Sequence, residues 1–192
     1  MKNAVIIHGR PSKEDYYNPQ EPSPSNDHWL PWLQAQLIKH DIITATPEMP
    51  RAYEPDYAQW SAEFERCNIT DQTILVGHST GGGFLVKWLS LHPNVKVGKV
   101  VLVAPWLGLE TDGTVSAFFA DLKIDPYLAL RTRGFYIFNS TDDDASIQTA
   151  VQQIREQVPS LDYREFTGKG HFTRTDLQST EFPELLEELL AP

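Results

Sequence analysis

The chain alternates short apolar runs with longer segments of helical period, and this alternation limits its fold more than any other feature. Apolar runs that end at Gly or Pro and precede such segments are typical of parallel strands joined by crossover helices. The predicted strands span residues 3–8, 42–46, 73–77, 99–103, 134–139 and 162–166. The predicted helices span residues 27–40, 55–67, 81–92, 145–158 and 183–190. The sequence therefore predicts an α/β fold with a mostly parallel six-stranded sheet and helices on both faces.

The length of 192 residues fits one compact domain over residues 1–192 and leaves no room for a large lid. Residues 9–28 are rich in Pro, Ser, Asn and Asp, which predicts a long surface loop after the first strand. Residues 104–133 are expected to hold one short helix and to wall off a pocket. Asn26 or Asp27 is expected to cap the first long helix.

The net charge of −10 repels phosphate backbones and anionic membranes, so we expect neither nucleic acid nor a membrane as a partner. The first apolar run has only four residues before a Gly, which is too short for a signal peptide or a membrane span. We therefore expect a cytoplasmic protein. Cys67 is the only cysteine, so neither an intramolecular disulfide nor a thiolate metal cluster can form, and it is expected to be a small buried hydrophobe.

The segment Gly77-His-Ser-Thr-Gly81 matches G-x-S-x-G and lies between a β-branched run and a helical segment. In this context the motif forces its serine into strained dihedral angles on a sharp turn, and glycines on either side avoid collisions. The serine hydroxyl is then exposed at the carboxyl end of the strand. Ser79 is therefore the candidate nucleophile, and the alternative is a glycine-rich turn that serves packing alone.

A serine hydroxyl needs a general base, and of six histidines only His171 follows the last predicted strand. Its glycine-punctuated loop is expected to be flexible enough to place the imidazole over Ser79. An orienting carboxylate should follow a strand between the two, which indicates one of Asp142, Asp143 and Asp144. The alternative is that this trio caps the next helix or binds a hard cation, but a calcium loop would need a Gly and a distal Glu that are missing.

Backbone amides beside the serine complete the predicted site. The N–H of Thr80 and that of Arg10, with Gly9 as the alternative to Arg10, are the candidate oxyanion-hole donors. Trp106 follows the predicted strand 99–103, and Phe172 follows the candidate base. Both are therefore expected to line the acyl pocket. The remaining tryptophans, Trp29, Trp32, Trp60 and Trp88, fit the apolar stripes of helices and are expected in the core. We expect no metal site and no cofactor.

Several elements together resemble the small lid-less serine hydrolases that include retinoblastoma-binding protein nine and its bacterial relatives. The resemblance runs along nearly the whole chain and rests on His28-Trp-Leu-Pro-Trp32, Pro47-Glu-Met-Pro50, Gly77-His-Ser-Thr-Gly81, Val100-Val-Leu-Val103, Ser140-Thr-Asp-Asp143 and Gly170-His-Phe172. It implies a cofactor-free serine hydrolase with Asp143 as the acid. The segment after Asp143 lacks the family's usual proline, which leaves Asp142 as the alternative.

Three functions remain open at this point. The first is hydrolysis of carboxylic esters or related acyl compounds through Ser79, His171 and Asp143, with a small acyl substrate. The second is a protein-binding scaffold with little or no activity, because fold does not dictate function. The third is acyl transfer or cofactor-free perhydrolysis with the same three residues and a different acceptor.

Overall fold

A computed structural model of the protein describes residues 2–109 and 116–191, and its six strands form one parallel sheet. In chain order the strands are β1 (Asn3–Ile7), β2 (Ile43–Ala45), β3 (Ile74–His78), β4 (Lys99–Val103), β5 (Phe135–Ser140) and β6 (Asp162–Phe166). Their order across the sheet is β2-β1-β3-β4-β5-β6, and every neighbouring pair is parallel. The predicted fold class is confirmed.

The strand sequences follow from where each strand lies in the sheet. Every residue of the central strands β3 and β4 is buried, which explains their unbroken apolar runs. The edge strand β6 has no buried residue and carries Asp162, Arg164 and Glu165. Because the carboxyl ends of parallel strands lie along one edge, the loops after β1, β3, β4, β5 and β6 converge there.

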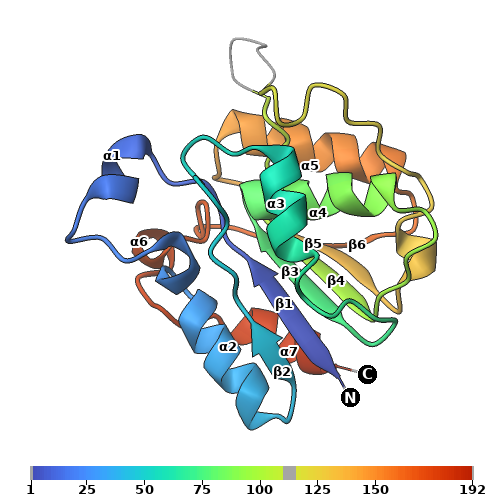
Figure 1. Ribbon diagram of the computed structural model, residues 1–192, viewed down its shortest axis with the longest axis horizontal. Coiled ribbons are helices and arrows are strands. Elements are labelled where there is room, and N and C mark those ends of the chain that lie inside the picture. The colour runs from blue at the N-terminus through green and yellow to red at the C-terminus, as the bar shows by residue number, and fades with distance from the viewer. Residues whose placement is uncertain (1, 110–115, 192) are drawn as a thin grey trace.

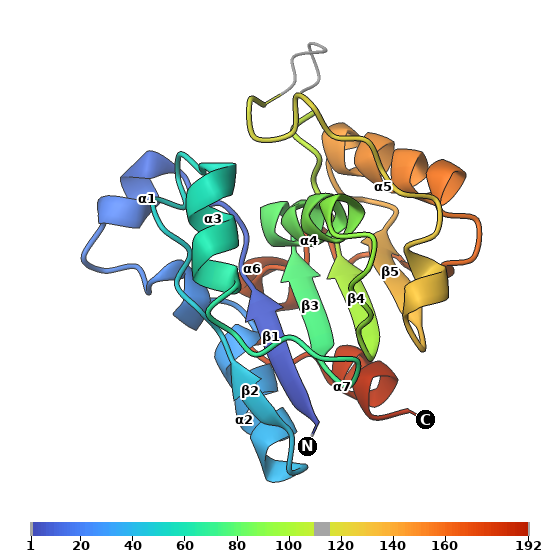
Figure 2. The ribbon, with the colours of Figure 1, turned by 45° about the vertical axis from the view of Figure 1, so that its right-hand side comes forward.

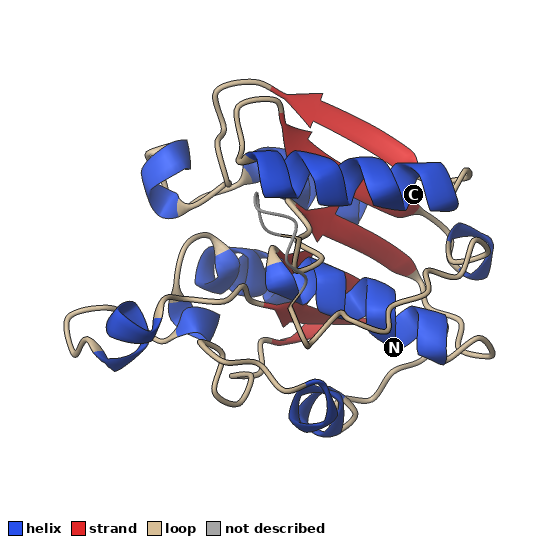
Figure 3. Cartoon of the chain, turned by 90° about the horizontal axis from the view of Figure 1, so that it is seen from above, coloured by secondary structure: helices blue, strands red, loops and turns tan. Residues whose placement is uncertain are grey.

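Helices cover both faces of the sheet (Figure 1 and Figure 2). One layer contains α3 (Tyr57–Phe64), α4 (Thr80–Leu91) and α5 (Ala145–Gln157), and the other contains α2 (Leu30–Lys39) and α7 (Pro183–Leu190). Seen from above, the first layer lies in front of the strands (Figure 3). Ten of the twelve residues of α4 are buried, so this helix packs deeply beside β3 and β4.

The first long helix starts later than predicted. The left-handed backbone of His28, at φ 55°, cannot continue a helix, so α2 begins at Leu30 with Trp29 as a cap that makes no side-chain bond. The expected cap by Asn26 or Asp27 is therefore wrong. Asp27 Oδ1 instead accepts a hydrogen bond from the amide of His28 at 2.6 Å.

The predicted loop over residues 9–28 contains two short helical pieces, α1 (Lys13–Tyr17) and the 3-10 turn η1 (Pro24–Asn26). Another short helix, α6 (Arg174–Leu177), follows β6, and the 3-10 turn η2 (Ala129–Arg131) lies in the expected wall segment, of which residues 110–115 are outside the described part. Cys67 and Trp32 are half-buried rather than buried. None of the described helices is long and apolar enough to cross a membrane.

Candidate active site

The turn between β3 and α4 holds Ser79 in a strained backbone conformation, with φ 53° and ψ −120°. Non-glycine residues rarely adopt positive φ, and strain of this kind is concentrated at functional sites. The carbonyl oxygen of Ser79 accepts hydrogen bonds from the amides of Gly83, at 3.1 Å, and Trp106, at 3.0 Å. Its own amide donates to Val103 at 2.9 Å, so the peptide groups on both sides of the serine are fixed.

Glycines allow the main chain to pack tightly around this turn. A Cβ atom on Gly77 would come within 2.7 Å of the Gly81 backbone. On Gly81 it would lie 2.4 Å from the carbonyl oxygen of Ile7, and on Gly83 1.9 Å from that of Trp106. Real Cβ atoms do not approach backbone atoms this closely, so the sharp strand-to-helix turn requires the glycines of the motif.

His171 lies after β6 and is joined to a buried carboxylate. Its Nδ1 donates to Asp143 Oδ2 at 2.9 Å and lies 3.2 Å from Oδ1. The Asp143 side chain is 2% exposed, whereas that of His171 is 30% exposed. A carboxylate only accepts, so this pair fixes the imidazole with its proton on Nδ1 and leaves Nε2 as a free base.

Hydrogen bonds hold the loop that carries His171 in the conformation that the structure shows. Asp142 accepts from the amides of Gly168, at 2.9 Å, and Gly170, at 3.3 Å. Asp176 accepts from the amide of His171 at 3.0 Å and from that of Thr173 at 3.1 Å. Gly168 and Gly170 have φ of 72° and 47°, so both adopt the left-handed backbone that favours glycine in tight turns.

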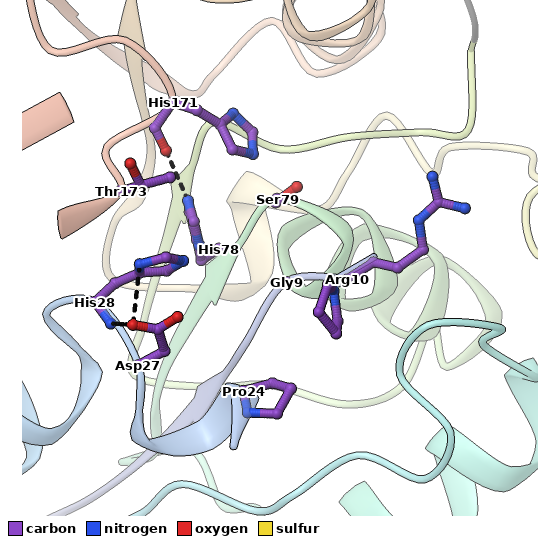
Figure 4. Close-up of a pocket in the computed structure, with 10 residues that line it drawn as sticks. Gly9, Arg10, Pro24, Asp27, His28, His78, Ser79, His171 and Thr173 are labelled. Carbon is purple, nitrogen blue, oxygen red and sulfur yellow. Dashed lines mark hydrogen bonds and ion pairs between the residues drawn. The ribbon is translucent and has the colours of Figure 1, made fainter. Parts of the chain in front are cut away.

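Two cavities meet at Ser79 and His171. One, of about 150 Å³, is lined on its far side by Pro24, Asp27 and His28. The other, of about 200 Å³, is lined by Arg10, Thr80, Trp106, Asp144, Ser146 and Ile147 as well. The imidazole of His171 extends toward the hydroxyl of Ser79 (Figure 4). Within the described residues no hydrogen bond joins the two side chains, as is common before a substrate tightens such a site.

The peptide unit between Gly9 and Arg10 is oriented by His8. His8 Nδ1 donates to the carbonyl oxygen of Gly9 at 2.7 Å, and its Nε2 accepts from the amide of Met49 at 2.9 Å. Burial lowers the pKa of His8, which favours this neutral, doubly bonded imidazole. In a trans peptide the C=O and N–H point in opposite directions, so the bond to Gly9 also fixes the direction of the Arg10 amide.

Gly9 and Arg10 both lie beside the serine. A Cβ atom on Gly9 would be 3.1 Å from Ser79 Cβ, so the end of β1 closely approaches the nucleophile candidate. The amide of Thr80 lies at the first turn of α4, where it has no partner within the helix. Backbone donors from two elements therefore lie on either side of Ser79.

The two predicted pocket residues differ in their positions. Trp106 lines the 200 Å³ cavity, and the guanidinium of Arg10 lies 4.7 Å above its ring. Phe172 is fully buried, and its ring stacks on Phe182 at 5.4 Å. The expectation that Phe172 lines the pocket is therefore wrong. Its φ of 56° turns the side chain away from the site and into the core.

Sequence reasoning missed the contribution of His28 and His78 to this site. Both line the 150 Å³ cavity, and His28 also borders an adjoining cavity of about 280 Å³ near Glu21 and Arg174. His78 Nε2 lies 2.8 Å from the carbonyl oxygen of His171. The motif His28-Trp-Leu-Pro-Trp32 at the start of α2 was the only local signal, because these contacts join distant segments.

Binding of a hard cation was the alternative role for Asp142, Asp143 and Asp144. Within residues 2–109 and 116–191, no three His, Cys, Asp or Glu side chains are grouped to hold a metal ion. Asp142 and Asp143 instead bind the His171 loop and imidazole, and Asp144 precedes α5 as its cap residue without a side-chain bond.

Solved structures share this fold at low sequence identity. The ydeN gene product of B. subtilis is 20% identical, with a TM-score of 0.79 over 98% of this chain and 97% of that one. Est1E from Butyrivibrio proteoclasticus, solved with ferulic acid, is 14% identical, with a TM-score of 0.66 over 99% and 88%. A bromoperoxidase from Bacillus anthracis is 15% identical, with a TM-score of 0.61 over 98% and 90%. These likenesses establish an α/β-hydrolase fold.

No curated protein matches the chain. The model of the family described as serine hydrolase, however, matches residues 20–190, which include Ser79, Asp143 and His171. That match covers most of the chain, and it agrees with the fold and with a strained serine beside a histidine and a buried carboxylate. The chain belongs to the serine hydrolase family.

Proposed function

We propose that the protein hydrolyses carboxylic esters or related acyl compounds through a triad of Ser79, His171 and Asp143. The observation that carries this proposal is the pair of His171 and buried Asp143 at the rim of the cavities that contain Ser79. The pair leaves the lone pair of His171 Nε2 available on the side where the serine hydroxyl lies. Kinship with the small lid-less hydrolases named above is part of the same proposal.

The first half of the reaction forms an acyl-enzyme. Ser79 Oγ attacks the carbonyl carbon of the substrate while His171 Nε2 takes the hydroxyl proton. The amides of Thr80 and Arg10 donate to the oxyanion that develops on the carbonyl oxygen. Collapse of the tetrahedral intermediate breaks the bond to the leaving group, which receives the proton from His171. Asp143 stabilises the imidazolium throughout.

The second half regenerates the serine. A water molecule loses its proton to His171 Nε2 and attacks the acyl carbon, and the second tetrahedral intermediate expels Ser79 as the proton returns to its oxygen. The cavity beside Trp106 has a volume of about 200 Å³, which suits a short acyl group. No cofactor, nucleic acid or membrane enters this proposal, and the substrate is a small acyl compound in the cytoplasm.

The test is hydrolysis of p-nitrophenyl esters of graded acyl length by the wild type, Ser79→Ala and His171→Ala. We expect activity toward short chains that falls by at least about 10³-fold in both variants. Fluorophosphonate labelling that is lost in Ser79→Ala supports the same assignment. A correctly folded wild type that neither cleaves these esters nor reacts with the probe would contradict the proposal and favour the scaffold alternative.

A further inference from the structure

His78 precedes the candidate nucleophile and is bound to the loop of the candidate base. It is the last residue of β3 and is 2% exposed, and its Nε2 contacts the carbonyl oxygen of His171 across 93 positions of sequence. Figure 4 shows this contact as a dashed line between the two side-by-side residues. One side chain therefore joins the strand that carries Ser79 to the backbone of His171.

The protonation state of His78 determines which ring nitrogen carries the proton in this hydrogen bond. Burial holds the pKa of His78 well below its usual value, so its imidazole is neutral. The neutral ring has a single N–H, and a carbonyl oxygen can only accept. The proton is therefore on Nε2, which donates to His171, while Nδ1 is buried without a partner among the described residues.

Aromatic neighbours prevent the His78 ring from turning away. The rings of His28, Trp29 and His171 lie 5.5, 5.7 and 5.0 Å from it, between centroids. Trp29 also donates from Nε1 to the carbonyl oxygen of Phe172 at 3.1 Å. Two successive carbonyl groups of the loop are thus held by side chains from the first half of the chain.

The remaining bonds to this loop come from the second half of the chain. Asp142 and Asp176 hold its amides, and Asp143 holds the imidazole, but none of these residues belongs to the strand or helix beside Ser79. They can preserve the shape of the loop without fixing its distance from the serine. Among the residues that the structure describes, only His78 joins the end of β3, next to Ser79, to the backbone of His171.

We propose that His78 is a positioning residue that sets the place of His171 relative to Ser79. The inference rests on the proposed function, in which His171 takes the proton of Ser79. Misplacement of reacting groups by about 1 Å can cost about 100-fold in rate. Loss of the His78 bond should therefore lower kcat with little change in KM, because His78 does not line the cavity beside Trp106 in which we propose that the acyl group binds.

Two substitutions distinguish the effect of the hydrogen bond to His171 from the effect of merely having a polar side chain at position 78. His78→Gln places its amide nitrogen near the position of the imidazole Nε2, so it can still donate to His171. His78→Asn places its amide near Nδ1 and does not reach the carbonyl. We expect kcat within about five-fold of wild type for Gln and a loss of about 50-fold or more for Asn, with KM within about three-fold for both.

His92→Asn supplies the matched control, because His92 stacks on Trp88 away from the site. It should leave kcat unchanged. Thermal unfolding of all three variants checks that each is folded at the assay temperature. Equal kcat for His78→Gln and His78→Asn, or a change in KM alone, would overturn the proposal.

Hydrogen exchange of residues 168–173 gives a readout that does not depend on activity. Exchange should be faster in His78→Asn than in wild type or His78→Gln. If the wild type is inactive toward all esters yet shows this pattern, the proposed function fails while the contact to His171 stands as a structural clamp. If esters are cleaved but exchange in this segment is the same in every variant, the positioning role fails and the hydrolase does not.

Discussion

Asp142 and Asp143 are adjacent in the chain but bind different parts of the same loop. Asp143 is buried against the imidazole of His171, whereas Asp142 accepts from Ser140 Oγ and from the amides of Gly168 and Gly170. The hydrogen bond from Ser140 contributes most to lowering the pKa of Asp142, and the two glycine amides lower it further. The sequence left these two aspartates as alternatives, and their contacts give each a separate role in the site.

Asparagine substitutions should separate the two roles. Asp143→Asn removes the charge that stabilises the imidazolium and offers an N–H to Nδ1, which favours the wrong tautomer; we expect kcat to fall by about 10³–10⁴-fold. Asp142→Asn should keep kcat within about ten-fold and lower the melting temperature, because it weakens the bonds to the loop. Ester hydrolysis and thermal unfolding of both variants provide the measurement. The reverse pattern would make Asp142 the triad acid.

At the scale of whole elements, the packing of α4 against β1 and β3 depends on glycine. Alanine in a helix is favoured over glycine by about 1 kcal/mol, so propensity alone predicts that Gly81→Ala is stabilising. The new Cβ would, however, lie 2.4 Å from the Ile7 carbonyl oxygen and 2.5 Å from that of His8. Both atoms belong to the main chain, so relief requires β1 and α4 to move apart.

We therefore expect Gly81→Ala to lower the free energy of unfolding by about 1–3 kcal/mol or more. Gly168→Ala is the comparison, because its Cβ would meet nothing within 4 Å and only its φ of 72° opposes the change. It should cost about 1 kcal/mol. Urea denaturation measures both. Wild-type stability in Gly81→Ala would mean that the helix does not pack this closely on β1.

The strands and long helices could be predicted because each has a local pattern. Apolar runs marked the buried strands, and the glycines around Ser79 marked the turn into α4. The short helices α1 and α6 have no apolar period, and they are held instead by side-chain caps at Ser12 and Thr173. Those caps, Ser-x-x-Asp and Thr-x-x-Asp, were readable signals. The late start of α2 was not, because it depends on the unusual φ of His28.

The candidate site divides in the same way. Chain order was enough to predict that Ser79, a following acid and His171 lie close together, because the fold places the ends of successive strands along one edge. Which way a side chain points was not predictable from order. Phe172 has a positive φ and its side chain lies in the core, and His78 contacts His171 only because the end of β3 packs against the distant loop after β6.

On the scale of the whole molecule, several histidines are buried in an acidic protein. Burial is the main cause that lowers the pKa of His8, His28 and His78 from the ordinary value of 6.5. The unfolded chain exposes these side chains, so it binds protons at a higher pH than the folded chain does. Their protonation is consequently coupled to unfolding, while the carboxylates that give the net charge of −10 remain largely ionised above pH 5.5.

The sign of this coupling predicts a loss of stability in mild acid. At pH values between the lowered folded-state pKa values and 6.5, the unfolded state binds more protons than the folded state. The contribution of these histidines to the free energy of unfolding is therefore complete above about pH 6.5 and decreases as the pH falls below it. Each fully neutral buried histidine contributes up to about 1.4 kcal/mol per pH unit. Urea denaturation at pH 7.5, 6.5 and 5.5 in about 0.15 M salt, which screens the surface charge, measures the slope. His78→Gln removes one such group and should make the slope shallower than in the wild type. A free energy of unfolding that stays constant or rises toward pH 5.5 would contradict the burial of neutral histidines between the sheet and the His171 loop.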